Sequence, residues 1–237
     1  DTGIVPAWSP DGAQIVYREE RRFHLITIEG DQIRREQLEL DGRVHVINRL
    51  VWSPDGERVA VEGYYRFGGD TTDYEIFAIE LDNSQLHNVS NHATAQDYGT
   101  TWSPDGSQMI FVSNREGSPA LYLVDVESGD LRYLAGSIGH ITAINWSPDG
   151  TLLAVVSRQP GRTPQLAVID LTQDSPTPQR LAENVAELPI SWSPDSNHLA
   201  YAADAPRRTI HLYTIAVRGD GQPRLLRTVD RMALLYP

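Results

Sequence analysis

The chain has no cysteine among its 237 residues. A disulfide framework, a thiolate metal site and a cysteine nucleophile are therefore excluded. Lysine is absent too, so all 20 basic residues are arginine, whose planar guanidinium suits carboxylate and phosphate groups. No apolar run approaches the roughly 18 residues that a membrane-spanning helix needs, so we expect no membrane insertion.

The formal net charge of −12 disfavours nucleic acid as a partner, because phosphates require a basic surface. We find no signal peptide, and the chain begins at Asp1 rather than at Met. This predicts an upstream segment that was removed or lies outside the sequence. It also leaves open that the chain is one part of a larger multidomain protein.

One pentapeptide recurs five times and contains all five tryptophans. Its copies begin every 44 to 50 residues, at Trp8, Trp52, Trp102, Trp146 and Trp192. Four copies read Trp-Ser-Pro-Asp-Gly, and the fifth has Ser196 in place of Gly. Periods of this length are typical of β-propellers with four strands in each blade.

Short apolar runs between turn residues predict the strands of each repeat. These runs are rich in Val, Ile, Leu and Tyr. In the third repeat the predicted strands are residues 97–102, 108–113, 121–126 and 130–134. No segment of twelve residues keeps a helical period. The sequence therefore predicts an all-β fold of five four-stranded antiparallel blades, at about residues 1–40, 41–90, 91–135, 136–182 and 183–237, in a single domain.

The pentapeptide has a structural explanation. Pro fixes φ, Asp bonds the backbone two residues on, and Gly accepts a positive φ, which together make a tight hairpin between the first and second strands. We expect a slightly different turn in the fifth copy. Each Trp is expected to be buried between neighbouring blades, in a structural role.

The third repeat carries a resemblance to a known family. Asn91-His92-Ala93, Asp97-Tyr98, the pentapeptide from Trp102 and the segments 110–117 and 121–125 resemble a TolB-type, WD-like propeller repeat. The resemblance implies a bacterial propeller engaged in protein–protein interaction in the cell envelope. A periplasmic or extracytoplasmic location is favoured on this ground alone, and the sequence leaves the compartment undetermined.

Five blades leave two arrangements open. In one, the five blades close into a ring, which removes exposed strand edges. In the other, they belong to a larger propeller with six or more blades, and the tail from Val229 is the inner strand of the next blade. We predict the closed ring.

The two faces of such a propeller differ. The pentapeptide hairpins form one face, here called the motif face. The loops between second and third strands and the segments between blades form the other, the loop face, which varies between repeats and is where recognition is expected. Candidate binding residues in its loops are Tyr64, Tyr65, Arg66, Phe67, Arg115, Arg158, Arg162, Arg207 and Arg208.

Each of these candidates also has a structural interpretation. The arginines suit an acidic protein or peptide partner, yet an Arg in a Ser-x-Arg-x-Gly pattern also pairs with a neighbouring blade. The aromatic residues have a composition typical of binding hot spots, or they pack on their own blade.

The segments between blades place a second set of polar residues at the mouth of the central channel. These are His45, Asp97, Tyr98, His140 and Glu187. They suit a ligand or metal site, or a solvated rim. We predict no metal and no cofactor, because the ligands show no spacing signature.

The sequence therefore favours a non-catalytic module that binds a protein or peptide partner through its loop face. No catalytic residue is predicted, since nucleophile elbows, zinc-protease motifs and phosphate loops are all missing. The alternative is an enzyme or part of one: a lyase or hydrolase with a site at the channel mouth, or the gating propeller of a peptidase.

Overall fold

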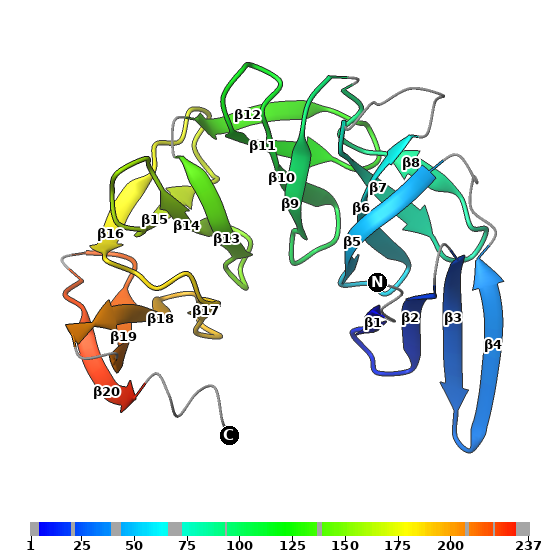
Figure 1. Cartoon of the computed structure of the whole chain (residues 1–237). Coiled ribbons are helices and arrows are strands. Elements are labelled where there is room, and N and C mark those ends of the chain that lie inside the picture. Colours follow the sequence, from blue (N-terminus) through cyan, green and yellow to red (C-terminus); the bar gives the residue numbers. More distant parts are fainter. Residues whose placement is uncertain are drawn as a thin grey trace. The chain divides into compact units, whose positions relative to one another are not determined.

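The computed structural model describes residues 5–19, 22–38, 44–65, 73–92, 94–136, 139–206, 209–219 and 221–230, with the main chain alone at residues 5 and 45–49. It contains five four-stranded sheets (Figure 1). The first is β1 (Val5–Trp8), β2 (Gln14–Glu19), β3 (Arg22–Glu29) and β4 (Gln32–Leu38). The second is β5 (Val44–Trp52), β6 (Arg58–Tyr65), β7 (Glu75–Glu80) and β8 (Leu86–Asn88).

The third sheet is β9 (Asp97–Trp102), β10 (Gln108–Ser113), β11 (Ala120–Asp125) and β12 (Leu131–Gly136). The fourth is β13 (His140–Trp146), β14 (Leu152–Arg158), β15 (Gln165–Asp170) and β16 (Gln179–Glu183). The fifth is β17 (Ser191–Trp192), β18 (His198–Ala205), β19 (Thr209–Ala216) and β20 (Arg224–Asp230). Within each sheet the strands lie in chain order.

The predicted all-β fold of five four-stranded antiparallel blades is confirmed. Strands β9 and β10 have the predicted bounds, and most other predicted strands shift by one to three residues. Val229 and Asp230 belong to β20 rather than to a following strand, and residues 231–237 lie outside the described residues. The described part of the chain contains no helix long and apolar enough to cross a membrane.

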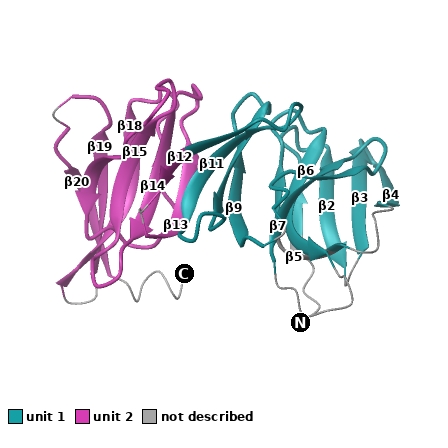
Figure 2. Ribbon diagram, turned by 90° about the horizontal axis from the view of Figure 1, so that it is seen from above, with its two compact units in different colours: residues 1–133 teal, residues 134–237 magenta. Residues whose placement is uncertain are grey.

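The chain forms two compact units, residues 1–133 and 134–237 (Figure 2). The first contains the first two sheets and most of the third, and the second contains the fourth and fifth sheets. Closure of the ring concerns the first and fifth sheets, which belong to different units, so it stays a prediction, as does the assignment to a single domain.

Within each unit the hydrophobic core lies between successive sheets. One cluster joins Val16 and Phe23 of the first sheet to Phe77 of the second. The next joins Ile76 of the second sheet to Met109 and Phe111 of the third. In the second unit, one cluster spans the fourth and fifth sheets. Because successive side chains of a strand point to opposite faces, Phe77 and Ile76 supply two different cores.

The motif tryptophans join successive sheets. Within the first unit, the Trp52 indole N–H donates to the carbonyl of Ala7 at 2.9 Å, and the Trp102 indole donates to Val51 at 3.0 Å. In the second unit, Trp192 donates to Asn145 at 3.0 Å. Each of these three indoles therefore bonds to the first strand of the sheet before its own, whereas the buried Trp146 Nε1 has no hydrogen-bond partner among the described residues.

The expectation that all five tryptophans are buried is wrong for Trp8. Trp52, Trp102 and Trp146 are buried and Trp192 is partly buried, whereas Trp8 is 58% exposed. No sheet precedes β1 in the first unit, so Trp8 has no preceding strand in that unit to pack on.

The five pentapeptide turns share one hydrogen-bond pattern, shown here for the third copy. Asp105 Oδ1 accepts from the Ser103 hydroxyl at 2.6 Å and from the Ser107 amide at 3.1 Å. The Ser103 hydroxyl oxygen accepts from the Gln108 amide at 3.0 Å, and the Gly106 amide donates to the Ser103 carbonyl at 3.0 Å. The predicted bond from Asp to the backbone two residues on is confirmed.

The expectation of a different turn in the fifth copy is wrong. Ser196 adopts a φ of 58°, close to the 75° of Gly106, and its amide makes the same bond to Ser193. The Ser196 hydroxyl also accepts from the Asp149 amide at 3.1 Å, in the turn of the fourth sheet. This bond between turns offsets part of the strain of a positive φ at a residue with a Cβ.

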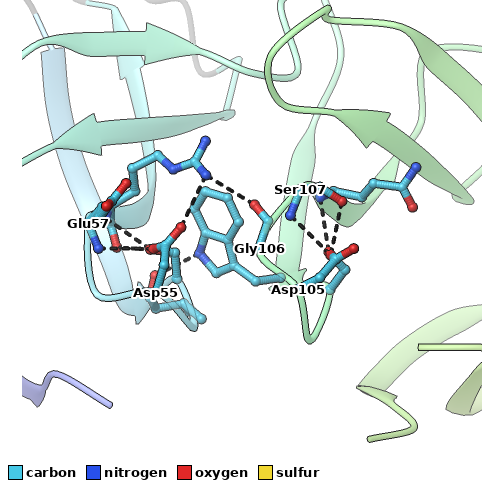
Figure 3. A network of polar contacts seen from close by, with 11 residues as sticks. Asp55, Glu57, Asp105, Gly106 and Ser107 are labelled. Carbon is cyan, nitrogen blue, oxygen red and sulfur yellow. Dashed lines mark hydrogen bonds and ion pairs between the residues drawn. The ribbon is translucent and has the colours of Figure 1, made fainter. Parts of the chain in front are cut away.

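A guanidinium links the turns of the second and third sheets (Figure 3). Arg58 lies over the Trp102 ring at 5.2 Å and donates to the Gly106 carbonyl at 3.2 Å. It also pairs with Asp55 at 3.4 Å. A Cβ at Gly106 would lie 3.2 Å from Asp55 Oδ2, so the two turns approach closely at this glycine.

We predict that Trp102→Ala lowers the free energy of unfolding by about 3–5 kcal/mol, because it removes a buried ring and its hydrogen bond. Trp8→Ala is the matched control and should cost no more than about 0.5 kcal/mol, as expected for an exposed side chain. Denaturant titration followed by circular dichroism measures both. Equal costs would contradict the different burial of the two rings and show that another surface covers Trp8.

The turn carboxylates predict an acid-dependent stability. Hydrogen bonds from the Ser193 hydroxyl and the Asn197 amide lower the pKa of Asp195 to about 2, from an ordinary value of 3.8. Because the folded-state pKa is the lower one, the stabilisation is complete above pH 4 and is lost as the pH falls toward 2. We expect Asp195→Asn to be less stable than the native chain at pH 6, with the difference shrinking by pH 2. Thermal melts across this range measure it, and a difference independent of pH would contradict the assignment.

Candidate functional site

The loop face of the first unit contains a buried ionic cluster around Arg115. Its guanidinium donates to the Ser113 hydroxyl at 2.9 Å and to the Ser90 carbonyl at 3.0 Å, and it lies 3.4 Å from Asp97 Oδ2. The same guanidinium covers the Tyr122 ring at 4.7 Å. The cluster therefore joins the end of β10 to the segment that links the second and third sheets.

Glu75 extends this cluster from the start of β7. Its carboxylate accepts from the Ser90 hydroxyl at 2.5 Å and from the His92 amide at 3.2 Å. Ser90 thus contacts Glu75 through its hydroxyl and Arg115 through its carbonyl. Nearby, the Gly99 amide donates to Glu62 at 2.7 Å. These bonds hold the loop-face segments of the second and third sheets in one arrangement.

Burial dominates the electrostatics of the two carboxyl groups. Glu75 is 5% exposed and Asp97 is fully buried. Burial raises the pKa of Asp97, and the hydrogen bonds from serine and the charge of Arg115 only partly oppose it. Burial likewise raises the pKa of Glu75, and the nearby Asp97 charge adds to the rise. Arg115 pairs with Asp97, whereas Glu75 is held by hydrogen bonds from Ser90 and His92.

Two sequence expectations change here. Arg115 was expected as a surface cation, but its side chain is 9% exposed and is bonded to the segment between blades. Asp97 was expected at an open channel mouth, but it is buried beneath Arg115. The pairing of an Arg in the Ser-x-Arg-x-Gly pattern with a neighbouring blade therefore describes Arg115.

The loop face of the second unit brings predicted residues together at the surface. His140 and Arg158 are cross-strand neighbours at the ends of β13 and β14. Arg158 Nε lies 3.3 Å from Glu187 Oε1, and both side chains are substantially exposed. Leu188, next in the chain, is 40% exposed. We call His140, Arg158, Glu187 and Leu188 the Arg158 cluster.

The main chain beneath the Arg158 cluster is tightly packed. Gly139 has a φ of 82°, and a Cβ there would lie 2.4 Å from the Arg158 carbonyl oxygen. A larger residue cannot occupy this position without moving β14. The glycine therefore helps to keep the ends of β13 and β14 in register, which positions His140 and Arg158.

The two predicted tyrosines lie at the end of β6 and are half-buried. Tyr65 packs edge-on against Phe77 with ring centroids 5.2 Å apart, at the margin of the core. Tyr64 packs edge-on against Tyr74 at 6.1 Å. Both rings therefore pack on their own blade rather than stand free.

The remaining candidates are distributed over the two units. Tyr98 is half-buried, and burial raises its pKa. Arg162 is exposed in the loop after β14. The main chain of His45 pairs with Tyr64, and its side chain is outside the described part. Arg66, Phe67, Arg207 and Arg208 also lie outside the described residues. In the described ranges, no group of three or more His, Asp or Glu is arranged to hold a metal ion.

Sequence reasoning missed three contributors, and two of them had a signal. Glu75 is a charged residue directly before the apolar run 76–79 of β7. Leu188 is an apolar residue in a segment that links two blades. Ser90 had no signal, because its role depends on a main-chain carbonyl that only the fold brings to Arg115.

Comparison with known proteins decides the family. A family model described as the TolB beta propeller domain matches residues 2–231. The chain belongs to this family. The expected resemblance is confirmed over nearly the whole length.

Solved structures agree on the fold. TolB from Acinetobacter baumannii is 23% identical, with a TM-score of 0.63 over 94% of this chain and 54% of that one. A structure described as a TolB from Agrobacterium tumefaciens is 20% identical, with a TM-score of 0.66 over 96% and 81%. An oligogalacturonate lyase in complex with manganese is 15% identical, with a TM-score of 0.50 over 91% and 76%. The chain thus spans about half the length of the Acinetobacter protein.

We predict different roles for Arg115 and Arg158 in stability. Arg115→Ala should lower the free energy of unfolding by about 3–5 kcal/mol, because it leaves buried Asp97 without its cation. Arg158→Ala, which removes an exposed ion pair, should cost about 0–1 kcal/mol. Denaturant titration of the two variants measures the difference.

An Asp97→Asn background supplies the control. Removing Arg115 there should cost less than in the native chain, because no buried negative charge is left unpaired. An equal cost in both backgrounds would show that Arg115 acts through packing and not through its charge.

Proposed function

We propose that this TolB-type propeller is a non-catalytic module that presents its loop face to a protein or peptide partner. The observation that supports this most strongly is the Arg158 cluster. It combines the exposed Arg158 guanidinium, its ion-pair partner Glu187 and the exposed leucine that follows Glu187 in the chain. Arginine is enriched among the residues that dominate binding energy at protein interfaces.

The charge of the cluster indicates an acidic partner. Glu187 pairs with Arg158 at 3.3 Å, and both side chains face water, so this pair contributes little to stability. An acidic side chain of a partner replaces Glu187 at low cost. The Arg158 guanidinium then pairs with the partner's carboxylate, and the bound partner covers this pair. The role that the family resemblance implies, protein–protein interaction, agrees with this chemistry.

A capture experiment tests the proposal. The immobilised chain is exposed to an extract of its source organism, and bound proteins are compared for the native chain, Arg158→Glu and Leu188→Ala. We expect both variants to lose the main captured protein, because each removes one element of the cluster. The control is Asp174→Arg, which reverses an exposed charge in the β15–β16 connection, on the motif face of the same unit. Equal loss in all three variants, or in none, would contradict use of the loop face.

A second function rests on the two carboxyl groups with raised pKa. Such groups mark acid–base sites in enzymes, and an oligogalacturonate lyase shares this fold at low identity. The burial of Asp97 and Glu75 opposes this function, because a substrate cannot reach either of these two carboxyl groups from the surface. Incubation with oligogalacturonate and Mn²⁺, followed by absorbance of the unsaturated product, tests it. Activity that Asp97→Asn abolishes would overturn the non-catalytic assignment.

A further inference from the structure

The second unit has a cavity between the fourth and fifth sheets, on the side of the motif face. Its volume is about 540 Å³, which is within the range of small-molecule sites. The lining comes from the start of β14, the end of β15, the β15–β16 connection and the β19–β20 connection. The Arg158 cluster lies at the other end of β14, so the two places are separate.

The two connections that form the walls are the longest of their kind in the five sheets. Connections between third and fourth strands are residues 30–31, 81–85 and 126–130 in the first three sheets. In the fourth and fifth sheets they are residues 171–178 and 217–223. Binding residues concentrate in such variable loops on a rigid scaffold. The difference between the repeats therefore directs attention to this cavity.

The floor of the cavity is aliphatic. It is formed by Leu152, Val168 and Val217, all three of which are buried. The same residues belong to the hydrophobic core between the fourth and fifth sheets. Because core side chains are held by their neighbours, the floor is a fixed apolar surface.

Asp170, at the end of β15, contributes a negative charge to one wall. Its Oδ1 accepts from the Thr172 hydroxyl at 2.6 Å and from the Thr172 amide at 3.0 Å, and its Oδ2 accepts from the Gln173 side-chain amide at 3.0 Å. These hydrogen bonds and the charge of Arg218 lower the pKa of Asp170. The carboxylate is therefore ionised at neutral pH and held in one orientation, and Oδ2 has a lone pair for a further donor.

Arg218, in the β19–β20 connection, contributes a positive charge to the other wall. Its side chain is 64% exposed, and its nearest carboxylate in the described ranges is Asp149 at 3.9 Å. The connection turns tightly around it, since Gly219 has a φ of 81° and a Cβ at Gly221 would collide with the Ala216 carbonyl. A guanidinium has five donors, so it can bind a second carboxylate beside its present partner.

The lining thus combines one carboxylate, one guanidinium and an aliphatic floor. A free α-amino acid has the matching groups, because it carries an ammonium, a carboxylate and a side chain on one carbon atom. Thr151, Thr177 and Gln179 complete the rim with hydroxyl and amide groups. A neutral sugar would use these polar groups but would provide no opposite charge for Asp170 or Arg218.

We propose that this cavity binds a free α-amino acid with an aliphatic side chain. Arg218 pairs with the α-carboxylate, Asp170 accepts from the α-ammonium, and the side chain lies on Leu152, Val168 and Val217. The site is separate from the loop-face function proposed above, and each stands or fails independently of the other.

The probe is L-leucine, titrated into the isotopically labelled full chain and followed by amide chemical shifts. We expect saturable shifts at residues 151–152, 170–173 and 217–219. Two analogues remove one charge each: N-acetyl-L-leucine lacks the ammonium, and L-leucinamide lacks the carboxylate. Each should bind about tenfold more weakly than L-leucine, because one charged hydrogen bond is lost.

Two variants assign the charges to their residues. Arg218→Gln should bind L-leucine and L-leucinamide with equal affinity, because the partner of the carboxylate is gone. Asp170→Asn should bind L-leucine and N-acetyl-L-leucine equally. The matched controls, Arg180→Gln and Asp174→Asn, change exposed residues of the same unit outside the lining and should keep both preferences.

Four results would overturn the proposal. These are a titration without saturation, shifts confined to the loop face, tighter binding of D-glucose than of L-leucine, and an unchanged preference for L-leucine over L-leucinamide in Arg218→Gln. If Asp170→Asn does not fold, the comparison of L-leucine with N-acetyl-L-leucine on the native chain still decides whether the ammonium is recognised. Equal affinity of the native chain for these two ligands would also contradict the proposal.

Discussion

The indole hydrogen bond of the motif tryptophan links one sheet to the next. A four-stranded sheet has two apolar faces and cannot bury both alone. At Trp52, Trp102 and Trp192 the ring packs between neighbouring sheets, and its N–H donates to the first strand of the preceding sheet. The same side chain thus packs between two sheets and forms a hydrogen bond from one sheet to the other. This bond fixes the position of one sheet along the strand direction of the next.

The turn that follows each tryptophan keeps the ring in place. The serine hydroxyl donates to the aspartate carboxylate, and each of the two groups accepts a hydrogen bond from a turn amide. The hairpin is therefore held by hydrogen bonds within the turn itself. Contacts between turns then add to the coupling between sheets, through Arg58 in the first unit and through the Ser196 hydroxyl in the second. The motif face therefore carries structural contacts between neighbouring turns.

Because every basic residue of the chain is an arginine, these cation contacts share one chemistry. The guanidinium is planar and weakly hydrated, so it stacks on an aromatic ring while it donates hydrogen bonds in its own plane. Arg58 does so over Trp102, and Arg115 does so over Tyr122. The fifth sheet keeps a stacked aromatic pair at Tyr201 and Tyr213.

The sequence by itself determined the repeat, the number of blades and most strand positions, because period, turn chemistry and apolar alternation are local properties. It also marked Arg115, Arg158 and Glu187 as residues of one face. It could not distinguish the buried Arg115 from the exposed Arg158, since both follow the apolar run of a predicted second strand. Only the tertiary structure decided this, because the carbonyl of Ser90 and the carboxylate of Asp97 reach Arg115 across a sheet boundary, whereas Arg158 forms an exposed ion pair with Glu187. Burial and charge pairing depend on contacts between sheets, and no local pattern encodes them.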